Sequence, residues 1–180
     1  MNVGVGAVTS SVRYGLTPSD SSVEFEARST LHVMHGKAIG LSGSIDVSWN
    51  ADGTIAAQPS PKMHVDLPVE QLRSGNGMLD REMWKLIDSK RFPRVAADLR
   101  TLELTAAPSR YAASGDITLA GRSRRYNGEF TVTHDEARIT IEGELNVDIR
   151  DFGLKPPNLV IVKVDPGVKV RVRLVAARAA

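Results

Sequence analysis

Strict alternation of apolar and polar residues runs through most of this chain and constrains its fold more than any other feature. From Val23 to Leu31 the odd-numbered positions are apolar or small, and the even-numbered positions are mostly charged. The same period of two recurs over residues 111–119, 126–132, 139–148 and 168–174. Because successive side chains of a β-strand point to opposite faces, each segment is predicted to be a strand with one buried and one solvated face.

Further strands are predicted over residues 36–49, 62–69 and 95–104. In the last of these the apolar parity shifts between Leu99 and Leu102, as a β-bulge would require. Turn signals separate the strands at Asp52-Gly53, Pro59-Ser60-Pro61, Pro108-Ser109 and Asp165-Pro166-Gly167. The Asp151-Phe152-Gly153 tripeptide is interpreted as a turn at a strand end whose Phe packs inward.

One segment has helical spacing instead, and predicts a short helix over about 78–89. Its apolar residues are Leu79, Met83, Leu86 and Ile87, and either Ser74 or Asn76 is placed to cap it. About eight strands and one helix favour a sheet closed on itself, because closure removes exposed edges. We therefore predict a mainly β fold: one eight-stranded antiparallel barrel with the helix near one mouth. A barrel of eight strands is just wide enough to hold a slender ligand.

Composition narrows the class of protein. The chain has 180 residues, 42% of them hydrophobic and 24% charged, which suits one domain rather than a disordered chain. We expect residues 1–12 to be loosely ordered and residues 13–177 to form the barrel. The absence of cysteine excludes disulfides, zinc–thiolate sites and thiol nucleophiles. No apolar run is long enough for an integral membrane segment, and the first residues lack a secretory signal, so a cytoplasmic protein is expected.

Charge and motifs give little sign of catalysis. The net charge of +2 predicts no nucleic-acid partner, and the basic cluster from Arg122 to Arg125 is interpreted as a solvated turn. Phosphate-binding loops, dinucleotide-binding motifs and the nucleophile elbow are absent. On a strand, His32 and His35 point to opposite faces unless Gly36 allows a bend, whereas His64 and Asp66 share a face. We therefore predict no catalytic residue, no metal site and no resident cofactor.

Apolar residues on the expected inner faces are the remaining candidates for a binding site. Those on strands are Phe25, Leu31, Ile117, Phe130, Ile141 and Val147, and Met83 and Trp84, with Met78, form a predicted lid over one mouth. An ordinary packed core and an open ligand tunnel give the same pattern, and the pattern alone favours the packed core.

The residues also resemble those of the YceI-like family of polyisoprenoid-binding proteins over positions 14–175. The matching motifs are Tyr14-Gly15-Leu16-Thr17-Pro18, Ser22-Val23-Glu24-Phe25, Gly43–Val47, Leu72–Asp80, Ile87–Pro93, Gly115–Gly121 and Asp148–Leu154. The resemblance implies a lipocalin-like barrel that encloses a long isoprenoid or similar amphiphile, including quinone-like lipids, and that commonly forms a homodimer. Polar groups at the mouth would set specificity, and Ser74, Asn76 and Tyr126 are the candidates.

The leading prediction is therefore a non-enzymatic carrier of a long apolar ligand. A first alternative is a small metal- or haem-assisted enzyme that uses His32, His35 or His64, because the histidine-containing segment 29–36 departs from the family pattern. A second alternative is a ligand-free scaffold that binds itself or a partner through a strand edge or helix face.

Overall fold

The computed structural model describes residues 10–159 and 162–180. Most of the segment 1–12, predicted to be loosely ordered, lies outside the described residues, and the first strand begins at Val12. The elements are β1 (Val12–Leu16), β2 (Ser22–Ser29), β3 (Val33–Ala38), β4 (Ser42–Val47), β5 (Lys62–Pro68), the 3-10 turn η1 (Val69–Gln71), α1 (Gly77–Ile87), β6 (Arg94–Leu104), β7 (Arg110–Leu119), β8 (Arg122–His134), β9 (Arg138–Asp148), the 3-10 turn η2 (Ile149–Phe152), β10 (Asn158–Leu159) and β11 (Val162–Arg178).

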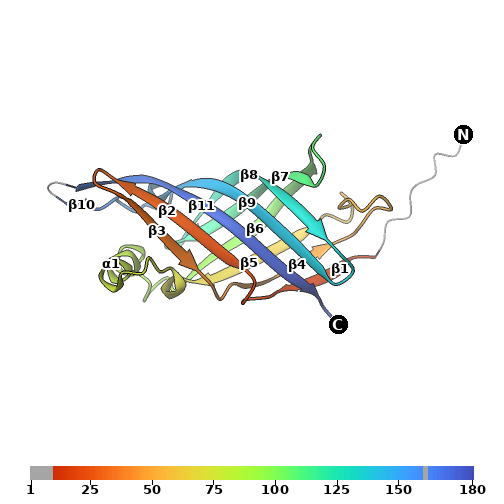
Figure 1. Cartoon of the computed structure of the whole chain (residues 1–180), viewed down its shortest axis with the longest axis horizontal. Helices are drawn as coiled ribbons and strands as arrows, with labels where there is room; N and C mark the ends of the chain where they lie inside the picture. The colour runs from red at the N-terminus through yellow and green to blue at the C-terminus, as the bar shows by residue number, and fades with distance from the viewer. Residues whose placement is uncertain (1–9, 160–161) are drawn as a thin grey trace, which may run out of the picture.

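Eight antiparallel strands close into a barrel, which confirms the predicted fold (Figure 1). The ring runs β1-β4-β5-β6-β7-β8-β9-β11 and closes because β11 also pairs with β1. The long strand β11 changes partner along its length: residues 164–173 pair with β2, and residues 176–178 pair with β1. β2 carries β3 on its other edge, so two extra strands widen the wall at one end.

The packed core fills the end of the barrel where β1 lies. Its largest members come from inward positions of seven strands and one connecting loop, and all are buried: Tyr14, Leu16, Leu41, Ile45, Val47, Leu67, Tyr111, Val132, Ile139 and Leu174. Two tyrosine hydroxyls anchor the 48–56 loop to this core. The Tyr14 hydroxyl accepts a hydrogen bond from Trp49 Nε1 at 3.2 Å, and Tyr111 accepts one from the Ile55 amide at 3.0 Å.

Two bulges interrupt the strand pairing. The register of β6 against β7 shifts between Leu99 and Thr101, which confirms the bulge predicted from the apolar parity. The turn predicted at Asp165-Pro166-Gly167 is wrong, because β11 continues through these residues. There the register against β2 shifts between Val164 and Val168, and a bulge tolerates a proline that cannot donate to a neighbouring strand.

Helix α1 begins one residue earlier and ends two residues earlier than predicted. Asn76 caps it, its Oδ1 accepting from the amides of Met78 and Leu79, and Asp88 in the left-handed conformation ends it. The helix lies beside the end of the barrel opposite the packed core, where the β2–β3 turn also lies (Figure 1). After the helix, the Phe92 ring packs on Gly121 in the β7–β8 turn. Phe152 is buried, as predicted for the Asp-Phe-Gly turn.

Candidate functional site

The strand registers bring most of the predicted binding residues to one inner wall in the half of the barrel nearer α1. Phe25 lies opposite Val170, Ile117 opposite Ala97, and Phe130 opposite Gly143. These positions have the same parity as the core residues further along the same strands, so their side chains face the interior. Val147 is on the same face of β9, and Leu145 and Val170 complete this part of the wall. Ile141 shares that face but lies opposite Val132 and Leu174 and packs against the buried core.

Burial differs sharply between the two halves of the same strands. In β7, Tyr111 is buried whereas Ile117 is half-buried, and in β11 Leu174 is buried whereas Val170 is half-buried. Of the eight predicted apolar site residues, only Val147 is buried, and of the other seven only Ile141 packs against the buried core cluster. The inner wall near α1 is therefore less completely filled by side chains than the half near β1.

Two phenylalanine rings on this wall lie over glycines of neighbouring strands. The Phe25 ring in β2 covers Gly36 in β3, and the Phe130 ring in β8 covers Gly143 in β9 and contacts Gly128. In each case an added Cβ on the covered glycine would clash with the ring. Because glycine has no side chain, each ring can lie against the wall rather than project across the interior.

Leu31 does not belong to this wall, and the prediction that it points inward is wrong. Strand β2 ends at Ser29, whose hydroxyl oxygen accepts hydrogen bonds from the amides of Leu31 and His32 and so turns the chain. Leu31 stands at the resulting tip with an exposed fraction of 66%.

The predicted lid residues Met83 and Trp84 are both half-buried in α1, and Met78 is exposed. Trp84 fastens the helix to the segment that follows η1, because its Nε1 donates to the Leu72 carbonyl at 3.0 Å. The Arg73 guanidinium lies 5.6 Å from the centre of the Trp84 ring, a cation–π contact.

The three polar residues predicted at the mouth are each engaged in internal hydrogen bonds. Buried Asp80 accepts from both the amide and the hydroxyl of Ser74, each at 2.7 Å, and Asn76 caps α1. Sequence reasoning missed Asp80 as the group that organises this loop. A contact of Ser74 or Asn76 with a ligand head group stays a prediction.

Tyr126 is held at the same end of the barrel by η2. Its hydroxyl donates to Asp151 Oδ2 at 2.5 Å and accepts from the Asp148 amide at 3.3 Å, and its ring stacks on Phe152. Burial, followed by the hydrogen bond to Asp151, raises the pKa of Tyr126 to about 12. The hydroxyl therefore stays protonated and serves to pin η2 to β8.

The histidines named for the enzymatic alternative lie outside the barrel interior. His32 is exposed in the β2–β3 turn, and His35 on the outer face of β3 lies 3.9 Å from Glu26. His64 Nδ1 lies 2.7 Å from Asp98 Oδ1 on the outer wall, and its Nε2 lies 3.9 Å from Asp66. Within residues 10–159 and 162–180, no three His, Asp or Glu side chains are arranged to hold a metal ion.

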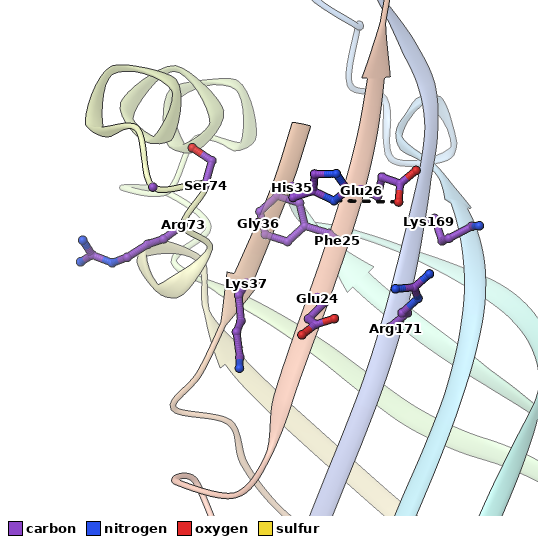
Figure 2. Close-up of a pocket in the computed structure, with 11 residues that line it drawn as sticks. Glu24, Phe25, Glu26, His35, Gly36, Lys37, Arg73, Ser74, Lys169 and Arg171 are labelled. Carbon is purple, nitrogen blue, oxygen red and sulfur yellow. Dashed lines mark ion pairs between the residues drawn. The ribbon is translucent and has the colours of Figure 1, made fainter. Parts of the chain in front are cut away.

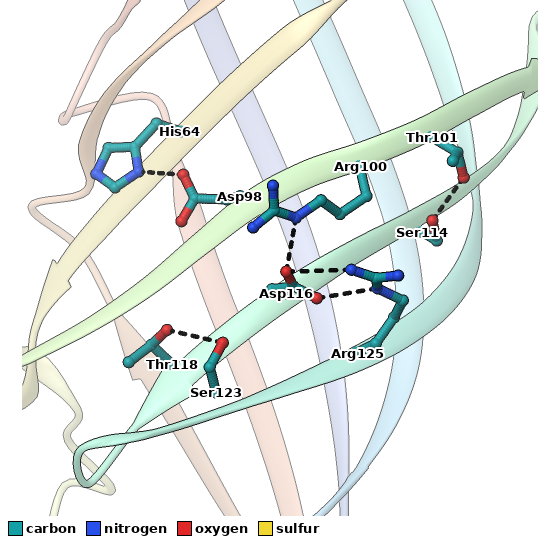
Figure 3. A network of polar contacts seen from close by, with 9 residues as sticks. All are labelled: His64, Asp98, Arg100, Thr101, Ser114, Asp116, Thr118, Ser123 and Arg125. Atoms are coloured by element: carbon teal, nitrogen blue, oxygen red, sulfur yellow. Dashed lines mark hydrogen bonds and ion pairs between the residues drawn. The ribbon is translucent and has the colours of Figure 1, made fainter.

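Ion pairs and hydroxyl pairs cover the outer wall around His64 (Figure 3). Asp116 accepts from Arg100 Nε at 2.6 Å and from Arg125 Nε at 3.0 Å, and these hydrogen bonds lower the pKa of the Asp116 carboxyl. Thr101 and Ser114 share a hydrogen bond on the same surface. The network joins neighbouring strands and brings no nucleophile within hydrogen-bond distance of His64 in the described chain.

A second surface feature is a groove of about 460 Å³ that crosses β11, β2 and β3 and reaches the segment 73–75; the predicted site residues Phe25 and Ser74 are part of its lining (Figure 2). Charged residues dominate its lining, including Glu24, Glu26, Lys37 and Arg73. Part of this charge is neutralised within the wall, since Lys169 and Arg171 both pair with Glu144. Its lining does not match the apolar ligand predicted for the interior.

Sequence reasoning also missed the glycine–aromatic pairs, although a signal was present. Gly36 lies opposite Phe25 in the register, and Gly128 and Gly143 take inward positions in their alternating strands, where apolar side chains are expected. A glycine at such a position indicates that a neighbouring group approaches the backbone closely. The partner ring could not be identified without the register between strands.

Comparisons with known proteins agree with the barrel architecture. A family model described as YceI-like domain matches residues 14–176. BcnA from Burkholderia cenocepacia is 18% identical with a TM-score of 0.74, over 89% of this chain and 99% of that one. A polyisoprenoid binding domain from Saccharophagus degradans, implicated in plant cell wall breakdown, is 13% identical with a TM-score of 0.72, over 93% and 99%. The YCEI protein of Campylobacter jejuni is 13% identical with a TM-score of 0.64, over 81% and 85%.

None of the curated proteins compared with the chain matches it. Among the described residues, no helix has the length and apolar character needed to cross a membrane.

Proposed function

Because the chain belongs to the YceI-like domain family, we propose that it is a non-enzymatic carrier that holds a long isoprenoid, or a similar amphiphile such as a quinone-like lipid, inside its barrel. The observation that carries the proposal is the difference between the two halves of the interior. Apolar side chains fill the half near β1, whereas the inward residues near α1, including Ile117 and Phe130, are half-buried. A wall of this kind suits an apolar chain that completes its burial.

Binding of such a ligand requires no catalytic group, because burial of apolar area alone supplies the free energy. Each methylene transferred from water to an apolar wall contributes about 0.8 kcal/mol before the costs of association are subtracted. A long isoprenoid chain therefore binds through area alone, and the width of the interior sets which chains fit. The flat position of the Phe25 and Phe130 rings against glycines supports this assignment, since it keeps both rings close to the wall.

Native mass spectrometry of protein purified without detergent tests the proposal, followed by solvent extraction of bound molecules. A hydrophobic adduct of defined mass is expected, and the same spectrum tests the homodimer that the family resemblance implies. Protein stripped of lipid should then take up an added polyprenyl quinone. Bare protein that also fails to take up the quinone would contradict the proposal.

A matched pair of variants tests whether the ligand binds inside the barrel. Ile117→Trp puts a large side chain on the inner face of β7, whereas Ala112→Trp adds the same group to the outer face of that strand. Quinone uptake should fall at least ten-fold in Ile117→Trp and stay near wild type in Ala112→Trp. Equal uptake by both variants would mean that the quinone binds elsewhere.

A further inference from the structure

Large apolar side chains are exposed together at the α1 end of the barrel. Leu31 in the β2–β3 turn is 66% exposed and Val33 at the start of β3 is 40% exposed, and Met78 and Leu79 in the first turn of α1 are 67% and 40% exposed. The turn and the helix lie at the same end of the molecule (Figure 1). Two further large apolar residues are exposed away from that end: Ile39, after the last residue of β3, and Leu104, at the far end of β6. Clustered exposure of this kind marks a surface that contacts something else.

Cations without carboxylate partners gather at the same end. Arg81, Lys85, Lys90 and Arg91 follow one another through α1 and the segment after it, and none forms an ion pair with a described residue. Most arginines of the barrel wall, by contrast, are neutralised. Arg13 pairs with Asp46, Arg100 and Arg125 pair with Asp116, and Arg171 pairs with Glu144.

Packing contacts extend this basic surface to the β7–β8 turn. The Arg91 guanidinium lies 5.1 Å from the centre of the Phe92 ring, and that ring packs on Gly121. Arg122 and Arg124 at the start of β8 follow this turn, are exposed and also lack ion pairs with described residues. The exposed carboxylates beside these cations are Glu82 and Asp88 on α1 and its C-cap and Glu70 in η1, so the cations still outnumber the exposed acids on this surface.

We propose that the α1 end docks on the surface of an anionic lipid bilayer. The exposed apolar residues Leu31, Val33, Met78 and Leu79 enter the interfacial layer, while the unpaired cations of α1, of the segment after it and of the start of β8 meet lipid phosphates. Charge complementarity selects this occupant, because the surface combines apolar side chains with excess positive charge. The inference deepens the proposed function and rests on it for its purpose, since the bilayer would be the place where the apolar ligand is exchanged.

Vesicle flotation tests the docking with no isoprenoid present. The intact protein should float with vesicles of phosphatidylglycerol and phosphatidylcholine at low salt and detach as salt rises, and it should bind pure phosphatidylcholine much more weakly. Reversing two charges at the α1 end, Lys90→Glu with Arg91→Glu, should weaken binding about ten-fold or more. Met78→Ser should weaken it further without changing the melting temperature.

The opposite end of the barrel offers matched controls. Lys62→Glu with Arg178→Glu makes the same change of charge at exposed residues of β5 and β11 near β1, and Leu104→Ser removes an exposed apolar group there. These variants should float like wild type. Equal losses at both ends, or equal binding to neutral vesicles, would overturn the docking proposal. Vesicle binding by a protein that takes up no polyprenyl quinone would instead overturn the proposed function and leave the docking intact.

Discussion

The ring of Phe130 in β8 lies across Gly143 in the neighbouring strand β9, in the space that any side chain at position 143 would occupy. The same added Cβ would also approach the Glu129 carbonyl oxygen at 2.9 Å. The absence of a side chain at one residue therefore fixes the position of the ring at another, and with it the width of the interior at this level.

Gly143→Ala should push the Phe130 ring away from the wall and into the interior. We expect a loss of about 1–3 kcal/mol in the free energy of unfolding, together with weaker uptake of a polyprenyl quinone. Urea unfolding and an uptake assay measure the two effects. Gly167→Ala in β11, where an added Cβ meets nothing within 4 Å, is the control and should change neither. Unchanged uptake in Gly143→Ala would show that the ring does not set the width available to the ligand.

Asp80→Asn should loosen the loop that leads into α1. The carboxylate is 4% exposed and accepts two hydrogen bonds from Ser74, and loss of its charge should cost about 1.5–3 kcal/mol. Thermal unfolding measures the loss, and hydrogen exchange should show faster opening of residues 74–87. Asp88→Asn is the matched control, because Asp88 is exposed and Asn tolerates its left-handed conformation. Similar losses in the two variants would mean that buried Asp80 has no special role.

The raised pKa of Tyr126 predicts a change in stability at alkaline pH. The native state favours the neutral phenol, so the stabilisation is complete below the ordinary pKa near 10 and is lost as pH rises towards about 12. Ultraviolet absorbance should show one tyrosine ionising near pH 12 in wild type, and that step should be missing in Tyr126→Phe. A Tyr126→Phe protein with an unchanged titration curve would contradict the assignment.

The lowered pKa of Asp116 predicts a loss of stability at acid pH, whereas the raised pKa of Tyr126 predicts one at alkaline pH. Hydrogen bonds from Arg125 and Arg100 lower the pKa of its carboxyl, so its contribution is present above the ordinary pKa near 4 and is lost as pH falls through the native value. Because the site is exposed, the effect on stability should be small. Carbon NMR of the carboxyl should locate its titration below the usual range in wild type, and at a higher pH in Arg125→Gln. An identical titration in that variant would rule out the ion pair as the cause.

The fold could be predicted because its determinants are local. Alternation identified most of the strands, although the segment predicted as one strand over residues 36–49 holds the end of β3, a loop and β4. The shift between Leu99 and Leu102 located a bulge, and of the two predicted caps, Ser74 and Asn76, the structure uses Asn76. The predictions from sequence were wrong where pairing with strands distant in the chain overrode a local signal. The Pro166-Gly167 signal predicts a turn, but β9 and β2 hold both flanks of the segment in one continuous strand.

The site was predictable only as a list of inward-facing positions. Phe25, Ile117 and Phe130 take inward-facing positions in their strands, and their role in binding stays a prediction, whereas Leu31 was misplaced because Ser29 ends its strand two residues earlier. Which inward residues are packed and which are half-buried depends on how the two ends of the barrel are closed. That closure is set by β11 changing partner from β2 to β1, a long-range relation that no local pattern contains.

The uneven filling of the barrel interior restricts how a ligand can enter and leave it. Side chains such as Tyr14, Ile45 and Ile139 fill the interior at the β1 end, so a ligand bound as we propose would reach the interior only from the α1 end. A linear amphiphile would then insert its apolar tail first and leave with its head group first. Its polar head group would therefore stay at the α1 end, the same end that we propose docks on the bilayer.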